Sequence, residues 1–107
     1  MFTALVNMTP RAIEVWHYTA QSKSVGQDAG DGVSIGVKAG LHTIKLLRKR
    51  GAPDTDDIKH MRRVISFIKR MRAQAPRKDR ETSRWRYALM NWGHDPLKLE
   101  DADSPWR

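Results

Sequence analysis

The feature that most limits how this chain can fold is one long segment, residues 55–74, in which apolar and basic residues recur with the period of an α-helix. One half of its helical wheel is apolar (Ile58, Met61, Val64, Ile65, Phe67, Ile68 and Met71), and the other half carries Arg62, Arg63, Lys69 and Arg70. We expect Asp54 or Thr55 to cap this helix, with Asp56 and Asp57 in its first turn and Pro76 ending it. The segment therefore predicts a long amphipathic helix with one face for a core.

Two helices are predicted in the first half of the chain. Thr9-Pro10 is a helix-start signal, and we expect a short helix over residues 9–19 with Ile13 and Trp16 in contact. A second helix is expected over residues 34–50, ended by Gly51, with one apolar face made of Val37, Gly40, Leu41, Ile44 and Leu47. Residues 20–34, rich in Ser, Gly, Gln and Asp, are expected to form a loop. The alternation of Val33, Ile35 and Val37 leaves a short strand open as an alternative.

A fourth helix is predicted over residues 82–92, capped by Thr82 and ended by Gly93. Its apolar face carries Trp85, Ala88, Leu89 and Trp92, and we expect both tryptophans to be buried. The sequence thus predicts an all-α fold, a compact single domain of about four helices. Residues 1–98 form the expected basic helical domain, and residues 99–107 an acidic, flexible C-terminal tail. With no cysteine in the chain, the core has to hold this fold without disulfides.

The positive charge is concentrated in one region. The whole chain has a net charge of +8, but residues 45–86 hold 15 of the 20 Lys and Arg residues against 5 acids, so the rest of the chain sums to −2. A clustered excess of this size favours a phosphate-rich partner. Arginine is the commoner base in the cluster, and its planar fork suits phosphate groups and guanine edges.

The candidate nucleic-acid contacts are the basic residues of this region: Lys45, Lys49, Arg50, Lys59, Arg62, Arg63, Lys69, Arg70, Arg77, Lys78, Arg80, Arg84 and Arg86. Ser22, Lys23 and Ser24 are further candidates for a phosphate contact, because hydroxyls and amides of a polar loop can bind a phosphate. The turn Gly51-Ala52-Pro53-Asp54 has a length that suits a helix-turn-helix. In that arrangement, the residues facing the groove are Lys59, Arg62, Arg63, Ser66 and Arg70.

Catalytic and metal-binding constellations are not evident in the sequence. The four histidines, His17, His42, His60 and His94, have no metal-binding spacing, and His94-Asp95-Pro96 is typical of a turn. The Gly-rich loop lacks the residues that a nucleotide site needs, so we expect no cofactor, no metal and no enzyme activity. Tyr87, among arginines, is the candidate for stacking on a base.

Four stretches of the chain resemble one family: Val6-Asn7-Met8-Thr9-Pro10, Ser22-Lys23-Ser24-Val25-Gly26-Gln27, His60-Met61-Arg62-Arg63-Val64, and Trp85-Arg86-Tyr87-Ala88-Leu89-Met90-Asn91-Trp92-Gly93-His94-Asp95-Pro96-Leu97-Lys98. These are similar to small bacterial and fungal proteins classed as a domain of unknown function, whose members are commonly called DNA-binding proteins. The resemblance implies nucleic-acid binding. The family pattern has Ser-Gly and then basic residues in its second helix, where this chain has Ala39-Gly40-Leu41-His42, so no contact from that position is carried over.

From these observations we expect a nucleic-acid-binding protein that binds double-stranded DNA in a sequence-tolerant way through a basic helix and loop. RNA binding stays open as an alternative, as does a protein-interaction or stress-adaptor module that docks an acidic partner. No segment is apolar enough for a membrane helix or a signal peptide, so we expect no membrane partner and a cytoplasmic, nucleoid or nuclear location rather than secretion. The oligomeric state stays open.

Overall fold

The computed structural model describes residues 2–26, 30 and 32–98, and in this part of the chain every regular element is a helix. The elements in order are α1 (Phe2–Leu5), α2 (Pro10–His17), α3 (Ala20–Lys23), α4 (Ile35–Arg48), α5 (Thr55–Arg72), a 3₁₀ turn η1 (Arg80–Thr82) and α6 (Arg84–Asn91). The expected all-α fold is confirmed, and its four longer helices are the four that the sequence predicts. None of the described helices combines the length and apolarity that crossing a membrane requires.

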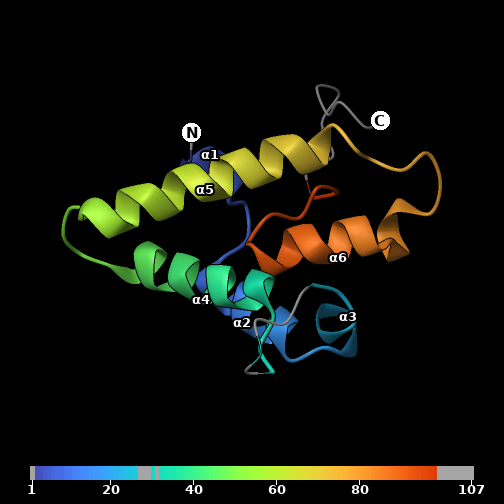
Figure 1. The fold of residues 1–107 in the computed structure, drawn as a ribbon, viewed down its shortest axis with the longest axis horizontal. Helices are drawn as coiled ribbons and strands as arrows, with labels where there is room; N and C mark the ends of the chain where they lie inside the picture. The colour runs from blue at the N-terminus through green and yellow to red at the C-terminus, as the bar shows by residue number, and fades with distance from the viewer. Residues whose placement is uncertain (1, 27–29, 31, 99–107) are drawn as a thin grey trace.

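The helices pack in three levels (Figure 1). α5 lies across the top of the view with α1 against it, α4 and α6 lie beneath α5, and α2 and α3 lie below these two. α4 and α5 run in opposite directions, joined by residues 49–54. Because only one side of α5 meets other helices, its opposite side is left facing outward.

The core lies between α5 and α6. Val64 and Ile68 from α5 and Leu89 from α6 are completely buried, and Trp85 and Trp92 are almost so, as predicted. Phe67 stacks on Trp92 with ring centroids 4.1 Å apart and planes 9° from parallel. Complete burial of each aliphatic side chain contributes about 1.5–3 kcal/mol, so this contact fixes α5 to α6. A smaller cluster of Met8, Ile13 and Ile44 joins α2 to α4.

The helix starts follow local hydrogen bonding. Of the two predicted caps of α5, Asp54 is the one used: its carboxylate accepts the Asp57 N–H at 2.8 Å, and the Asp57 carboxylate accepts the Asp54 N–H at 3.1 Å. The predicted Thr82 cap is wrong. Thr82 ends η1, and Ser83 caps α6 by accepting the Arg86 N–H at 3.1 Å. Three residues before α6 tighten into the 3₁₀ turn, which moves the start of the helix.

Three other expectations are corrected. The first residues of the predicted 20–34 loop form α3, because the Thr19 hydroxyl caps a helical turn by accepting the Ser22 N–H. The strand alternative fails because Ile35 and Val37 belong to α4. The buried face of α4 is also rotated from the predicted one: Gly36, Ala39, Gly40, Thr43 and Ile44 are buried, whereas Leu41 is 48% exposed.

Asn91 at the end of α6 connects the lower helices. Its side-chain oxygen accepts hydrogen bonds from the Trp16 indole, at 2.7 Å, and from the Ser22 hydroxyl, and its amide donates to the Ser22 carbonyl at 3.2 Å. α4 passes so close that a Cβ built on Gly40 lies 2.1 Å from the Asn91 carbonyl oxygen. Only glycine fits there, which explains a residue that is otherwise costly inside a helix.

Candidate nucleic-acid interface

The outward side of α5 is basic along most of its length. Lys59, Arg62, Arg63, Lys69 and Arg70, which we call the basic face of α5, are all exposed, as is Ser66 between them. They fall within one arc of the helix because they are spaced by three, four and seven residues. From Lys59 to Arg70 the face extends about 16 Å along the helix axis at 1.5 Å per residue. These include all five residues that the helix-turn-helix hypothesis assigns to the groove.

Acidic residues are absent from a long stretch around this face. Between Asp57 and Asp79 the sequence has eight Lys or Arg residues and neither Asp nor Glu. Lys59, Arg62 and Lys69 form no ion pair with any residue that the structure describes. Arg77 and Lys78, exposed in the loop that follows α5, are likewise without a described partner. Asp56 lies one turn before Lys59 on the same side of α5, so beyond this first turn no acid of α5 offsets the positive charge.

Two arginines of the basic face rest on aromatic rings. The Arg63 guanidinium carbon lies 5.2 Å from the Trp92 ring centroid, and that of Arg70 lies 5.8 Å from the Phe67 centroid. Trp92 and Phe67 are the two stacked core rings, so one aromatic pair supports both cations. Cation–π contact orients the guanidinium groups while their N–H donors stay available to a partner.

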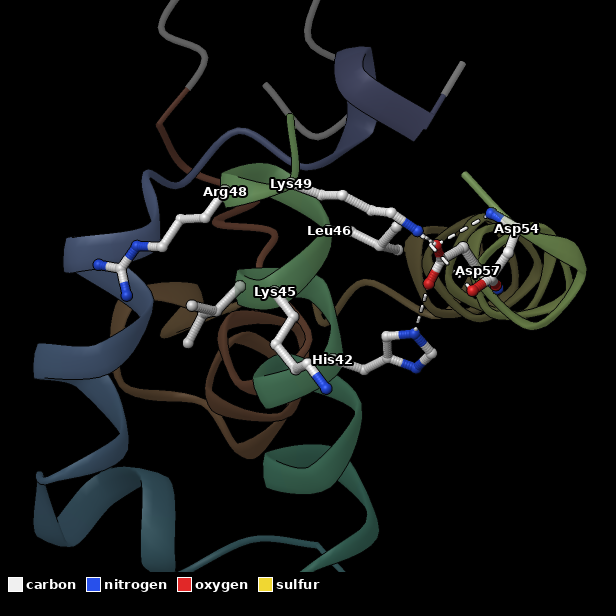
Figure 2. Close-up of a pocket in the computed structure, with 8 residues that line it drawn as sticks. His42, Lys45, Leu46, Arg48, Lys49, Asp54 and Asp57 are labelled. Carbon is white, nitrogen blue, oxygen red and sulfur yellow. Dashed lines mark hydrogen bonds and ion pairs between the residues drawn. The ribbon is translucent and has the colours of Figure 1, made fainter. Parts of the chain in front are cut away.

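Lys49 does not belong to the basic face of α5, because it neutralises a carboxylate between α4 and α5 (Figure 2). Its ammonium lies 2.6 Å from Asp57 Oδ2 and 3.7 Å from Asp54, and His42 Nε2 lies 3.1 Å from Asp57 Oδ1. Hydrogen bonding from Lys49 holds the pKa of Asp57 well below its ordinary value, and the pKa of Lys49 is raised in return. In Figure 2, Lys45 and Arg48 border the same pocket, of about 470 Å³, but point away from Asp57.

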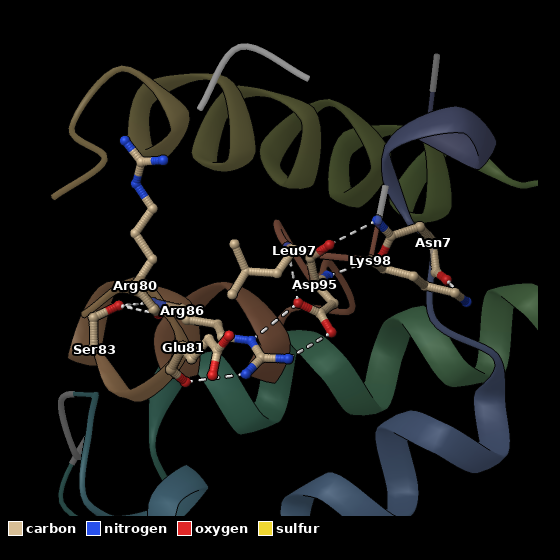
Figure 3. Close-up of polar contacts among 8 residues, drawn as sticks. All are labelled: Asn7, Arg80, Glu81, Ser83, Arg86, Asp95, Leu97 and Lys98. Carbon is tan, nitrogen blue, oxygen red and sulfur yellow. Dashed lines mark hydrogen bonds and ion pairs between the residues drawn. The ribbon is translucent and has the colours of Figure 1, made fainter. Parts of the chain in front are cut away.

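Arg86 is also engaged within the fold (Figure 3). Its Nε and Nη2 donate to the two Asp95 oxygens at 3.1 and 3.0 Å, and Nη1 donates to the Glu81 carbonyl at 3.0 Å. Asp95 in turn accepts the Leu97 N–H, and its backbone is paired with Asn7. The predicted turn at His94-Asp95-Pro96 is therefore a structural clamp, and most donors of Arg86 are used in it.

The other predicted contacts divide by position. Arg80 and Arg84 each use one donor within the chain, to the carbonyls of Pro76 and Ser24 respectively. Lys45 and Arg50 are exposed at the end of α4 and beyond it. Lys45 belongs to α4 and Arg50 to the segment between α4 and α5, so the thirteen basic candidates do not all lie on the basic face of α5.

The Ser22-Lys23-Ser24 group separates in the same way. Ser22 is completely buried, with its hydroxyl on Asn91, so it does not reach a surface phosphate. The Ser24 hydroxyl donates to the Gln21 carbonyl at 2.7 Å. Lys23 is exposed, and it remains the candidate of this group for a phosphate contact. The polar loop predicted from sequence is a capped helical turn, which places these hydroxyls on backbone groups.

The aromatic candidate also has a different setting from the expected one. Tyr87 is half-buried, and its ring packs against Trp16 with centroids 5.5 Å apart. Among the described aromatic residues, Tyr18 is the most exposed, at 82%, and it directly follows α2 rather than lying on the basic face of α5.

The residue cluster that sequence reasoning missed lies between α4 and α5. His42 stacks on His60 with centroids 4.0 Å apart, and His60 Nε2 lies 3.0 Å from the Thr43 hydroxyl. Burial, reinforced by the charges of His42 and Arg63, lowers the pKa of His60 to about 4. The capping-box spacing of Asp54 and Asp57 was the one sequence signal available. Among the described residues, no group of three or more His, Cys, Asp or Glu side chains is arranged to hold a metal ion.

Comparison with known proteins gives one match. The sequence model of a family described as "Protein of unknown function (DUF3140)" matches residues 1–90. Neither a curated protein nor a solved structure matches this chain. The matched range covers every helix of the fold except the last residue of α6.

Proposed function

Because the chain belongs to the DUF3140 family, whose function is unknown, its role has to rest on its own surface, and we propose that it binds double-stranded DNA through the basic face of α5. The binding is sequence-tolerant, directed mainly at phosphates, with Arg77 and Lys78 of the following loop as flanking contacts. The chemistry is that of a binding protein, and we assign it no catalytic step. Such a role implies a location in the cytoplasm, the nucleoid or the nucleus.

One observation carries this proposal: an exposed helix face with five cations in a stretch of chain that has no acidic residue. Cations on a solvated helix face are usually interspersed with acids, which keeps the face soluble without attracting polyanions. Here no acid between Asp57 and Asp79 offsets the repulsion among the cations, and a row of phosphates would relieve it. Counter-ions released from DNA would add to the gain in free energy.

The dimensions and side chains of α5 suit a duplex. A helix of about 27 Å, at 1.5 Å per residue, enters a major groove about 12 Å wide and reaches the phosphates on both sides. α5 then enters the groove with α4 packed behind it, in an antiparallel pair rather than the crossed helices of a helix-turn-helix. The basic face has neither Asn nor Gln, the usual readers of adenine, so the base edges that it suits are those of guanine.

Duplex DNA is favoured over single strands by the setting of the aromatic residues. Proteins that bind single-stranded nucleic acid stack bases on exposed aromatic rings. Near the basic face the rings of Phe67 and Trp92 stack on each other, and Tyr87 packs on Trp16. Tyr87 is the residue that the sequence offered for stacking on an RNA base, and its packing on Trp16 counts against RNA binding. Competition between duplex DNA and single-stranded RNA measures the difference directly.

The test is a titration of a fluorescent DNA duplex at several salt concentrations. About six phosphate contacts give a slope near −5 for log affinity against log salt. Arg62→Ala removes a cation of the basic face that has no partner among the described residues. The slope should become shallower by about 1. The matched control is Arg11→Ala, which removes an exposed cation on α2 and should leave the slope unchanged. Absence of binding even at low salt would contradict the proposal.

A second candidate is an interaction module for an acidic protein partner, and one surface favours it. Val15, Tyr18 and Leu41 are 50%, 82% and 48% exposed on α2 and α4. Tyr18 and Leu41 border a groove of about 420 Å³ that Glu14, Lys45 and Arg48 also line. Pull-down from lysate with and without nuclease separates the two candidates. Partners retained after nuclease treatment support the protein-interaction module, and partners lost support DNA binding.

A further inference from the structure

We propose that the acidic segment 99–107 lies back on the basic face of α5 in its own chain and competes there with nucleic acid. The competition rests on the proposed function, whereas the contact itself does not. The segment, which lies outside the described residues, holds Glu100, Asp101 and Asp103 against the single base Arg107. Its charge is opposite to that of the basic face of α5.

The described chain ends beside α5. The Lys98 N–H donates to the Asp95 carbonyl at 3.2 Å, and its ammonium donates to the Asn7 carbonyl. Leu97 packs against the core cluster to which Val64 and Ile68 of α5 belong. Figures 1 and 3 both show this end of the chain alongside α5. The acidic segment therefore begins next to the helix that we propose it covers.

The acids of the segment lie close enough to Lys98 to reach part of the basic face. Asp103, the last of them, is five residues beyond Lys98 and so lies within about 17 Å of it, against about 16 Å from Lys59 to Arg70. A short tether also keeps the two partners at an effective concentration of the order of millimolar. A contact too weak to form between separate molecules can therefore be populated within one chain.

Other cations of the described surface attract the acidic segment less. Arg48 is paired with Glu14, Lys49 with Asp57 and Arg86 with Asp95, so each of these charges already has a counter-ion. The basic face of α5 combines several cations with no described carboxylate. Three carboxylates gain the most Coulomb energy there, and the gain falls as salt is added.

The absence of cysteine makes a direct test simple, because Ser104→Cys creates a single site for a nitroxide spin label. We expect the label to broaden the amide signals of Lys59–Arg70 at low salt but not those of Arg11–His17, and the broadening should vanish at about 0.5 M salt. Equal broadening of both segments, or none, would overturn the proposal. Mixing labelled chains with unlabelled, ¹⁵N-enriched chains checks the origin: broadening in the unlabelled chain means contact between copies and overturns contact within one chain.

The competition is tested with charge variants of the full chain. The variant E100Q/D101N/D103N removes the three carboxylates, and D28N/D31N/E81Q removes three others as a control for net charge. If the segment covers the basic face about four-fifths of the time, the first variant should bind a DNA duplex about fivefold more tightly than the control. Equal affinities would overturn the competition. Spin-label contact without DNA binding by any variant would instead refute the proposed function and leave the contact standing.

Discussion

Lys49 at the end of α4 and Asp57 in the first turn of α5 form an ion pair with an Nζ–Oδ2 distance of 2.6 Å. The same carboxylate accepts the Asp54 N–H and meets His42, so one side chain completes the cap of α5 and links it to α4. The pair therefore ties the first turn of α5 to the end of α4. Because α5 is held by its inner side and its first turn, the basic residues are left facing outward.

The first prediction concerns this pair and acid. The pKa of Asp57 is depressed in the folded chain, so its stabilising effect is present above the ordinary Asp pKa near 3.8 and is lost as the pH falls below it. Asp57→Asn should lower the melting temperature at pH 7. The difference in melting temperature between this variant and the original chain should become smaller towards pH 2. Thermal unfolding followed by circular dichroism measures both. A constant difference at all pH values would contradict the assigned role.

A second prediction follows from His60, whose folded pKa of about 4 lies below its ordinary 6.5. Since the unfolded chain takes up the proton first, stability should fall as the pH drops from about 7 to about 4, by up to about 1.4 kcal/mol per pH unit, and then level off. His60→Gln removes this contribution, so its stability should depend less steeply on pH over that interval. Urea unfolding at pH 7 and pH 5 compares the two chains. Parallel slopes would count against a buried neutral His60.

The third prediction tests the close approach of α4 to α6. Gly40→Ala should destabilise the fold by about 1–3 kcal/mol, because the added methyl collides with the Asn91 carbonyl and the His17 ring. Gly51→Ala is the control, since nothing lies within 4 Å of the atom it adds, and it should change stability by less than about 0.5 kcal/mol. Chemical denaturation reports both values. Equal costs would mean that α4 and α6 are not packed this closely.

A fourth prediction separates structural arginines from those on the basic face. Arg86→Ala breaks the clamp on Asp95 and should lower the melting temperature, while DNA affinity measured well below that temperature stays close to that of the original chain. Arg62→Ala should do the reverse, because it has no described partner to lose. Measuring stability and affinity on the same preparations gives the comparison. If the folded Arg86→Ala variant lost much of its affinity for DNA, Arg86 would have to be counted among the DNA contacts.

Much of the helical framework was predictable because its signals are local. The apolar period of 55–74, the choice of Asp54 or Thr55 as cap, and the burial of Trp85 and Trp92 all depend on residues within a few turns of one another. The Thr82 cap was wrong because two hydroxyls in succession, Thr82 and Ser83, are both good caps, and the 3₁₀ turn decides between them.

Which polar and charged side chains pair with one another was not predictable. Lys49 and Asp57 are eight residues apart, Arg86 and Asp95 nine, and Ser22 and Asn91 sixty-nine, so their pairing depends on how the helices pack. The same holds for Leu41, which a wheel places on the inner face of α4. Small residues at Gly36 and Gly40 let α6 approach on another side, which turns Leu41 towards solvent.

The contact between Arg63 and Trp92 has a practical consequence. An indole's fluorescence responds to the charges around its ring, and this ring has a guanidinium on its outer face and Phe67 stacked on it. Drawing Arg63 towards a phosphate would remove the cation from that face without disturbing the core beneath it. Because Trp92 is one of four tryptophans in the chain, a variant that keeps only this one would report binding at the basic face by a change in its emission.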